Sequence, residues 1–223
     1  MIRRMFTGIT RGTFPVVSVV REPALLRYAV DLGEYGAGLE LGASVSIDGV
    51  CQTVAKLEGA RVWFDAIQET LDKTTLGALE EGAEVSVERS AKVGDEIGGH
   101  DVSGHVVGTG EIAAVQKDGH EVVLTVRVPP AWMKYVMPKG FIAIDGSSLT
   151  VGETDDAAGT FRLYLIPETL RLTNLGAKGA GAKVNVELDP RTVAIVDTVE
   201  RVQNELEEAM DTQADVTESL CAP

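Results

Sequence analysis

The sequence of 223 residues contains only two cysteines and no long apolar run. Cys51 falls in an expected strand and Cys221 in a polar terminal segment, so we expect no structural disulfide and place the chain in a reducing cytoplasm. No apolar stretch approaches the roughly 20 residues that a membrane-spanning helix needs. The charged segment Met1-Ile2-Arg3-Arg4 is not followed by the apolar core of a signal peptide, so we also expect no secretion signal.

Positive charge is scarce as well. The chain has 20 Lys and Arg residues against 34 Asp and Glu residues, a net charge of -14 at pH 7. This charge repels phosphate backbones and anionic lipids, so we expect neither nucleic acid nor a membrane as a partner. Histidine is also rare, with three residues in all. His100 and His105 would point to opposite faces of extended structure, and no further Cys or His clusters nearby, so we expect no metal site.

What the chain does have is an internal repeat. Blocks of sequence recur in the same order in the two halves. They are Phe6 to Gly8 and Val102 to Gly104, Ile47 to Val54 and Ile144 to Val151, Glu69 to Leu71 and Glu168 to Leu170, Thr75 to Gly77 and Asn174 to Gly176, and Val85 to Glu88 and Val184 to Glu187. The offset drifts only from 96 to 99 residues, so the halves are copies of one domain of about 95 residues. Two similar pockets suit a reaction between two similar molecules.

Each half consists of short apolar runs separated by Gly and Asp turns. Ser44 to Ile47 alternates with period two before the Asp48-Gly49 turn, and Val62 to Ile67 is typical of a further strand. About six short strands per half predict a closed antiparallel barrel, because closure removes the unprotected edges of so small a sheet. Short helical segments of one or two turns are expected at residues 70–79 and 169–176.

The C-terminal segment predicts one longer helix. Asp189 can cap it, and Pro190 suits its first turn. One apolar stripe runs along it, formed by Ile195, Val199, Val202, Leu206 and Met210. The stripe must be buried by self-association or against the chain's own barrel, and periodicity favours neither. The expected parts of the chain are a barrel at 5–96, a second barrel at 97–189, the helix at 190–210 and a disordered acidic tail at 211–223.

The two copies differ where their side chains are reactive. Cys51 of the first copy matches Ser148 of the second, and Ile9 matches His105. Cys51 shares one face of its strand with Thr53, which favours a lined pocket. A thiol at this place is equally explained as a small buried apolar side chain.

Two further features have simpler explanations. Asp189, which matches Ser90 of the first copy, is explained as a helix cap. The glycine-rich stretch Gly98-Gly99-His100 lacks the strand–loop–helix context of a phosphate-binding loop. Taken singly, none of these signals defines a function.

Taken together, the motifs of this chain resemble the α-chain type of riboflavin synthase, a family built from a lumazine-binding repeat. The resemblance runs from Met5 to about Val202. Its motifs are Met5-Phe6-Thr7-Gly8-Ile9, Asp48 to Val54, Gly94 to His100, Val102-Ser103-Gly104-His105, Lys139-Gly140, Asp145 to Val151, and Leu165 to Leu170. Gln52 and Ser147 stand where the family usually has Leu and Ile. Strand alternation should turn both away from the pockets, so we expect altered packing and intact pockets.

The resemblance implies an all-β fold of two tandem six-stranded Greek-key barrels, with a C-terminal helix that assembles a homotrimer. It implies a transferase of riboflavin biosynthesis that needs no cofactor and no metal. Two molecules of 6,7-dimethyl-8-ribityllumazine would exchange a four-carbon unit, which yields riboflavin and 5-amino-6-(D-ribitylamino)uracil. The active site would form between the N-terminal barrel of one protomer and the C-terminal barrel of its neighbour. Lumazine synthase is a candidate partner, and the sequence does not show whether its capsid encloses this chain.

The resemblance also implies which residues bind substrate. In the N-terminal barrel they are Ser44, Cys51, Gln52, Thr53, Asp65, Ala66, Ile67, Gln68, Glu69 and Thr70. In the C-terminal barrel they are Ser148, Leu149, Thr150, Leu165, Ile166, Pro167, Glu168, Thr169 and Leu170, with Gly104, His105 and Val106 nearby and Lys139 at the rim. Gly8, Ile9 and Thr10 would lie over the interface.

Five residues are candidates for catalysis. His105 is expected to assist proton transfer at the acidic C7 methyl of the lumazine, because imidazole commonly titrates near neutral pH. Cys51 or Ser44 would help to activate the acceptor molecule. Asp189 would orient a partner hydroxyl. Ser148 is the fifth candidate, and no step of the reaction is assigned to it.

Three other functions compete with this hypothesis. Related non-catalytic chains use the same barrels to hold a lumazine or flavin as a chromophore, but they lose the polar residues that this chain keeps at Cys51, His105 and Ser148. The flavin-binding barrel of a reductase would need a dinucleotide-binding half, and no such half follows. A structural or adaptor role is open to any duplicated barrel. The retained polar residues favour the enzyme.

Overall fold

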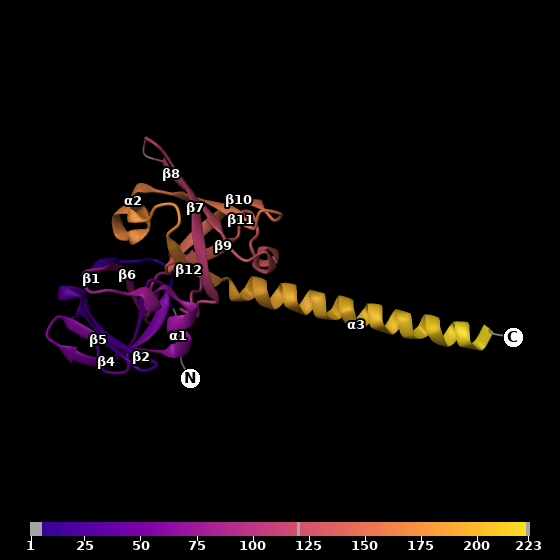
Figure 1. Cartoon of the computed structure of the whole chain (residues 1–223), viewed down its shortest axis with the longest axis horizontal. Helices are drawn as coiled ribbons and strands as arrows, with labels where there is room; N and C mark the ends of the chain where they lie inside the picture. Colours follow the sequence, from indigo (N-terminus) through magenta and orange to yellow (C-terminus); the bar gives the residue numbers. More distant parts are fainter. Residues whose placement is uncertain (1–5, 120, 222–223) are drawn as a thin grey trace. The chain divides into compact units, whose positions relative to one another are not determined.

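The computed structural model describes residues 6–119 and 121–221, with side chains as far as residue 210. The chain divides into two compact units, Met1–Asp189 and Pro190–Pro223, and the first unit contains both barrels. Figure 1 shows these barrels side by side, with the strands β1 to β6 in one and β7 to β12 in the other.

The first barrel is a closed antiparallel sheet of six strands. They are β1 (Gly12–Glu22), β2 (Leu25–Asp31), β3 (Ser44–Ile47), β4 (Val50–Glu58), β5 (Arg61–Ile67) and β6 (Glu84–Arg89). Around the barrel they follow the order β1-β2-β5-β4-β3-β6. Strands that are adjacent in sequence are therefore not always adjacent in the sheet, as Greek-key connections require.

The second barrel repeats this topology. Its strands are β7 (Gly108–Asp118), β8 (Glu121–Arg127), β9 (Phe141–Ile144), β10 (Ser147–Asp155), β11 (Thr160–Leu165) and β12 (Lys183–Leu188). Starting from β7, the order around the barrel is β7-β8-β11-β10-β9-β12, which is the order of the first barrel with every number raised by six. The predicted pair of tandem six-stranded barrels is confirmed.

Short helices interrupt both barrels at the same place. Strand β5 leads into α1 (Gln68–Lys73) and η2 (Thr75–Ala78), and β11 leads into α2 (Pro167–Leu172) and η4 (Asn174–Ala177). Each predicted helical segment is thus a short α-helix followed by a 3-10 turn. The threonine between them, Thr74 or Thr173, caps the second by accepting a hydrogen bond from the N–H of Leu76 or Leu175. Two further 3-10 turns, η1 (Gly33–Gly36) and η3 (Pro130–Tyr135), follow β2 and β8.

Strand β4 has one face inside its barrel and one outside. Val50, Gln52 and Val54 are buried, whereas Cys51 is half-buried and Thr53 is exposed. Strand β10 has the same pattern in the second barrel. The structure therefore confirms that the thiol and the threonine share one face, and it shows that this face is the outer one.

Both departures from the family pattern are buried. Gln52 points away from the outer face as expected, whereas Ser147 lines a cavity beside β10, so the expectation was wrong for Ser147. Gln52 is buried, and its Nε2 donates to the carbonyl oxygen of Cys51 at 3.0 Å. Ser147 is also buried, with its Oγ 3.2 Å from Oγ1 of Thr10. A ligand on the outer face would therefore meet the backbone of Gln52 and not its amide.

The two barrels meet through their Asp-Gly turns. Asp48 and Gly49 join β3 to β4, and Asp145 and Gly146 join β9 to β10. All four residues have positive φ, between 44° and 81°, as a type I′ hairpin requires. A Cβ atom on Gly49 would lie 2.4 Å from the backbone nitrogen of Gly146, so the two turns are in backbone contact.

Two asparagines of the second copy tie this contact to the first copy. Asn185 donates from Nδ2 to the carbonyl oxygen of Asp48 and to Oγ1 of Thr75, both at 2.8 Å. Asn174 donates to Oδ1 of Asp48 at 2.9 Å and accepts from the Ser86 hydroxyl at 3.0 Å. The joint between the barrels is therefore polar and specific in its pairing.

A buried carboxyl group lies at the centre of this joint. Burial, and then the charge of the nearby Asp145, raise the pKa of Asp48 from 3.8 to about 7. Lys178 pairs with Asp145, its Nζ 2.5 Å from Oδ2. Asp48 accepts from the Ser86 N–H at 2.7 Å and from the amide of Asn174, and these hydrogen bonds oppose the rise in its pKa. Burial outweighs them, so ionisation of Asp48 is disfavoured in the folded chain.

We expect Asp48→Asn to remove one source of pH dependence from stability. Between about pH 4 and pH 7 the folded chain keeps a proton on Asp48 that the unfolded chain has lost, so this group lowers the free energy of unfolding as pH rises. The wild type should lose up to a few kcal/mol more than the variant between pH 5 and pH 8, since one unit of pKa corresponds to about 1.4 kcal/mol. Urea unfolding at both pH values measures the difference.

The matched control for this experiment is Asp118→Asn, which removes an exposed carboxylate at the end of β7. It should leave the pH dependence of unfolding almost unchanged. The same response from both variants would contradict the assignment to Asp48. An asparagine at position 48 can still accept through Oδ1, so a simple loss of hydrogen bonds is avoided.

The second unit is a single helix, α3 (Pro190–Cys221). Other residues of the helix do not cover its apolar stripe, which runs from Ile195 (64% exposed) to Met210 (71% exposed). The helix continues through residues 211–221, where disorder was expected, because this stretch contains no Gly or Pro that would stop it. Residues 222 and 223 of the expected tail lie outside the described residues. In the part of the chain that is described, no helix is both long and apolar enough to cross a membrane.

Candidate active site

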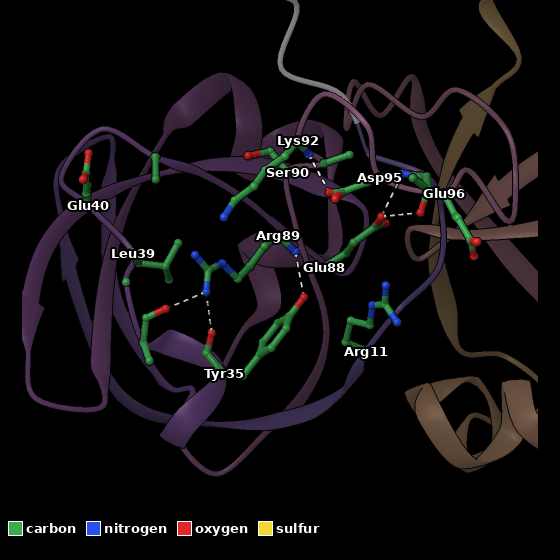
Figure 2. Close-up of a pocket in the computed structure, with 15 residues that line it drawn as sticks. Arg11, Tyr35, Leu39, Glu40, Glu88, Arg89, Ser90, Lys92, Asp95 and Glu96 are labelled. Atoms are coloured by element: carbon green, nitrogen blue, oxygen red, sulfur yellow. Dashed lines mark hydrogen bonds between the residues drawn. The ribbon is translucent and has the colours of Figure 1, made fainter.

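One candidate cavity lies at one end of the first barrel. Its volume is about 850 Å3, and acidic and basic side chains are mixed along it. Figure 2 shows Arg89 within this cavity, where its guanidinium donates to the carbonyl oxygens of Tyr35 at 3.0 Å and Ala37 at 2.8 Å. None of the residues expected to bind substrate lines it. We therefore turn to the second cavity.

The second cavity lies where β10, α2 and the N-terminal segment meet, and its volume is about 150 Å3. Eight of the residues that line it were expected in the site: Gly8, Ile9, Thr10, Ser148, Leu149, Ile166, Glu168 and Thr169. Three others were not expected: Ser147, Leu172 and Thr173. The last two were missed because they follow the recurrent Glu-Thr-Leu block. Residues four apart on a helical turn share a face, so Leu172 lies with Glu168 and Thr173 with Thr169. This cavity is the candidate site of the second barrel.

The backbone of the N-terminal segment lies directly on β10. The Ser148 N–H donates to the carbonyl oxygen of Gly8 at 2.8 Å. Gly8 has a φ of 73°, and a Cβ atom there would lie 2.6 Å from the Cβ of Ser148. Only glycine permits so close an approach, and it places Ile9 and Thr10 along the cavity.

The same crossing occurs on the first barrel with the roles of the copies exchanged. The Cys51 N–H donates to the carbonyl oxygen of Gly104 at 2.9 Å. Residues 104–106 were expected near the C-terminal pocket, and this expectation was wrong: they lie against the first barrel. The reason is that Phe6 and Val102 pair as an antiparallel bridge, so the segment of each copy passes over the barrel of the other.

Two buried glutamates hold the crossing segments in place. Glu88 accepts from the N–H and the hydroxyl of Thr7, both at 2.7 Å, and from the N–H of Gly8 at 3.0 Å. Glu187 binds Ser103 and Gly104 in the same way, at 2.7, 2.7 and 2.8 Å. Sequence reasoning assigned neither carboxylate a role. The available signal was that both recurrent Val-x-Val-Glu blocks end in a charged residue.

Burial raises the pKa of Glu88, and the hydrogen bonds from Thr7 and Gly8 oppose this shift. A carboxylate that accepts three N–H or O–H donors is held firmly, because charge-assisted hydrogen bonds are the stronger kind. Each crossing segment is therefore anchored on one barrel and covers the other.

The acidic residues expected to bind substrate are paired with cations. Glu69 accepts from Lys73 at 2.8 Å, and Glu168 pairs with Arg171. In each case the cation lowers the pKa of the carboxyl group. Asp65 forms a two-point pair with Arg27, at 2.8 and 3.0 Å, which also lowers its pKa. These carboxylates are charged at neutral pH.

The remaining expected residues divide between the outside and the inside of the barrels. Ser44 is opposite Thr53 in the β3–β4 pair, so the two share the outer face. His105 is exposed on the segment that crosses Cys51. Leu165 and Ala66 are buried at the ends of β11 and β5. The other expected residues follow these strands or belong to β5, β10, α1 and α2: Ile67, Gln68, Thr70, Thr150, Pro167 and Leu170, with Val106 next to His105.

Two expected residues lie outside the strands, in the segments that connect them or follow them. Lys139 is exposed in the turn before β9, with a φ of 67°, and its N–H donates to the carbonyl oxygen of Val151 at 2.8 Å. Asp189 is the last residue of the unit that contains the barrels. Among the described residues, no group of three or more His, Cys, Asp or Glu side chains could hold a metal ion.

Comparison with known proteins adds independent findings. The family model of the lumazine binding domain matches residues 7–90 and 103–189. The chain is 48% identical over 209 residues to the riboflavin synthase of Escherichia coli (strain K12), covering 93% of this chain and 97% of that protein. It is 44% identical to that of Chlamydia muridarum, covering 90% and 98%. LumP complexed with riboflavin has a TM-score of 0.77 at 23% identity, covering 83% and 100%, and shows a shared fold alone.

Proposed function

Because the chain belongs to the riboflavin synthase family and carries its lumazine-binding domain twice, we propose that it converts two molecules of 6,7-dimethyl-8-ribityllumazine into riboflavin and 5-amino-6-(D-ribitylamino)uracil. One molecule gives up a four-carbon unit to the other. The observation that carries this proposal is the pair of matching outer surfaces, at Cys51 and at Ser148, each covered by a segment from the other copy. Each surface would hold one lumazine.

The reaction depends mainly on how the two substrate molecules are positioned. The C7 methyl of a lumazine is acidic because its conjugate base is delocalised into the ring, so one molecule becomes a carbanion and the other accepts it. Holding two planar molecules face to face would supply most of the rate gain, since bound reactants avoid the entropic cost of meeting. Proton transfer at the methyl group is the step that a side chain would assist, and His105 is our candidate.

We expect His105→Ala to lower the rate of riboflavin formation by roughly 100-fold at neutral pH, the usual contribution of one general acid or base. Because His105 is exposed, the free energy of unfolding should not change. The rate is followed by the fluorescence of riboflavin, with purified protein and the lumazine and no added cofactor. Lys117→Ala, an exposed change at the far end of β7, is the control. Wild-type turnover from pH 6 to pH 8 would exclude His105 from proton transfer.

The same assay separates the enzyme from a chromophore-binding protein. Tight binding of the lumazine with no riboflavin formed would favour a protein that only holds its ligand. Identity of 48% to a riboflavin synthase over almost the whole chain favours turnover.

The active site is proposed to lie between protomers of a homotrimer. The cavity beside Ser148 has about 150 Å3, less than the roughly 300 Å3 of a site that encloses a ligand of this size, which supports the proposal that a second protomer completes the site. The exposed stripe of α3 supports self-association. A cytoplasmic location, suggested by the cysteine usage, and lumazine synthase as a candidate partner complete the proposal.

We expect Val202→Asp to dissociate the assembly, because it places a charge in the middle of the stripe. Sedimentation should give three chains per particle for the wild type and one for the variant, which should also lose activity. Gln203→Asp adds the same charge next to the stripe and is the control. If Val202→Asp remained a trimer, α3 would not be the assembling element.

A further inference from the structure

A histidine that sequence reasoning left unassigned lies beside the candidate site. Nδ1 of His100 is 2.6 Å from Oγ of Ser148, and the imidazole is buried. Its ring is stacked on Phe141 of β9, with 5.2 Å between centroids and 15° between planes. The hydrogen bond and the stack together allow the imidazole one orientation.

The backbone is built to bring this histidine there. The His100 N–H donates to the carbonyl oxygen of Thr7 at 3.1 Å, next to the bridge between Phe6 and Val102. A Cβ atom on Gly99 would lie 2.2 Å from that same carbonyl oxygen and 2.7 Å from the Cβ of Ser148. Glycine at position 99 is therefore required for the approach, which explains a motif that fits no phosphate-binding loop.

The two residue types of this arrangement occur at matched positions in one copy only. Ser148 is matched by Cys51 in the first copy, and His100, four residues before Gly104, is matched by Arg4, four residues before Gly8. A thiol and an arginine cannot reproduce a hydroxyl–imidazole pair. The two pockets therefore differ chemically although their folds match.

Only one member of the His100–Ser148 pair faces the cavity. Ser148 lines the cavity of the second barrel, whereas His100 does not. A serine hydroxyl turns easily about its Cβ–Oγ bond, and a hydrogen bond to a fixed partner leaves its remaining donor or acceptor pointing one way. Any influence of His100 on a ligand would pass through this hydroxyl.

We propose that His100 is a positioning residue that fixes the Ser148 hydroxyl toward the lumazine in the C-terminal pocket and so makes the two pockets unequal. The inference rests on the proposed function in one respect, since it takes the cavity beside Ser148 as a substrate site. It goes beyond that function by giving the second copy a histidine–serine pair whose residues the first copy does not have.

The test is a double-mutant cycle on the full-length assembly, with His100→Phe, Ser148→Ala and the double variant. Phenylalanine keeps a ring on Phe141 and removes the hydrogen bond. We expect His100→Phe to lower kcat by about tenfold, the effect of one hydrogen bond, with a smaller change in KM. In the Ser148→Ala background the same change should have no further effect. His100→Asn, whose amide can reach the position of Nδ1, should restore most of kcat.

Two results would overturn the proposal: wild-type kcat in His100→Phe, or equal losses from His100→Phe with and without the Ser148 hydroxyl. The second result would mean that the histidine acts on packing alone. Urea unfolding of each variant shows whether it is folded, and His100→Asn carries the test if His100→Phe is not. If the wild type binds the lumazine without turnover, the proposed function fails and the cycle is measured on riboflavin binding by fluorescence quenching, where the same non-additivity is expected.

Discussion

Replacing Gly49 by alanine is expected to lower the free energy of unfolding by about 3 kcal/mol. A Cβ atom at this position would lie 2.4 Å from the backbone nitrogen of Gly146, and backbone on both sides leaves no flexible side chain to move away. The φ of 81° adds strain of about 1–2 kcal/mol for a residue with a Cβ, and overpacking at the joint adds a similar amount. Urea unfolding measures the loss.

Gly59→Ala separates the two causes. Gly59 also has a positive φ, 63°, but a Cβ atom there would have nothing within 4 Å. It should therefore cost only the backbone strain of about 1 kcal/mol. Equal losses in the two variants would mean that contact between the Asp-Gly turns contributes nothing to stability.

The second large effect is expected from Glu88→Ala, with a loss of riboflavin formation of roughly 100-fold, or about 2.7 kcal/mol. The change removes the acceptor of three hydrogen bonds that hold Thr7 and Gly8. Those donors would be left in a buried place, which costs more than the bond itself. Gly8 is the residue that covers Ser148, so a change in the first barrel should damage the pocket of the second.

Two comparisons make this result specific. Glu84→Ala removes an exposed carboxylate from the same strand and should leave activity unchanged. The activity of Glu88→Gln should fall between those of the wild type and Glu88→Ala. Its amide oxygen can still accept from Thr7, whereas its NH2 group is a donor and cannot accept from the N–H of Gly8. Full activity in Glu88→Ala would show that the crossing segment keeps its place without the carboxylate.

These two predictions concern the same property of the duplicated fold. Each proposed pocket combines a strand from one barrel with a segment that precedes the other barrel, so neither copy alone would hold a complete site. The turns at Gly49 and Gly146 fix how closely the barrels approach. Glu88 and Glu187 hold the segments that cross from one barrel to the other. Such a site tolerates little change in how the barrels meet.

Local order was predictable from the sequence. Alternation along Val50 to Val54 assigned Cys51 and Thr53 to one shared face, because the period of a strand is two. Matching positions in the repeat predicted two equal barrels, and the turn residues Asp48 and Gly49 predicted the hairpin. Eight of the residues around the cavity of the second barrel followed from the motifs.

Tertiary structure alone decided which parts of the two copies meet. The sequence placed Gly104 and His105 with the wrong barrel, left Glu88 and Glu187 without a role, and set His100 aside. The contacts that settle these points join residues 48 to 84 positions apart. Strand period and turn chemistry act over a few residues, whereas these hydrogen bonds exist only once two barrels have docked at their Asp-Gly turns.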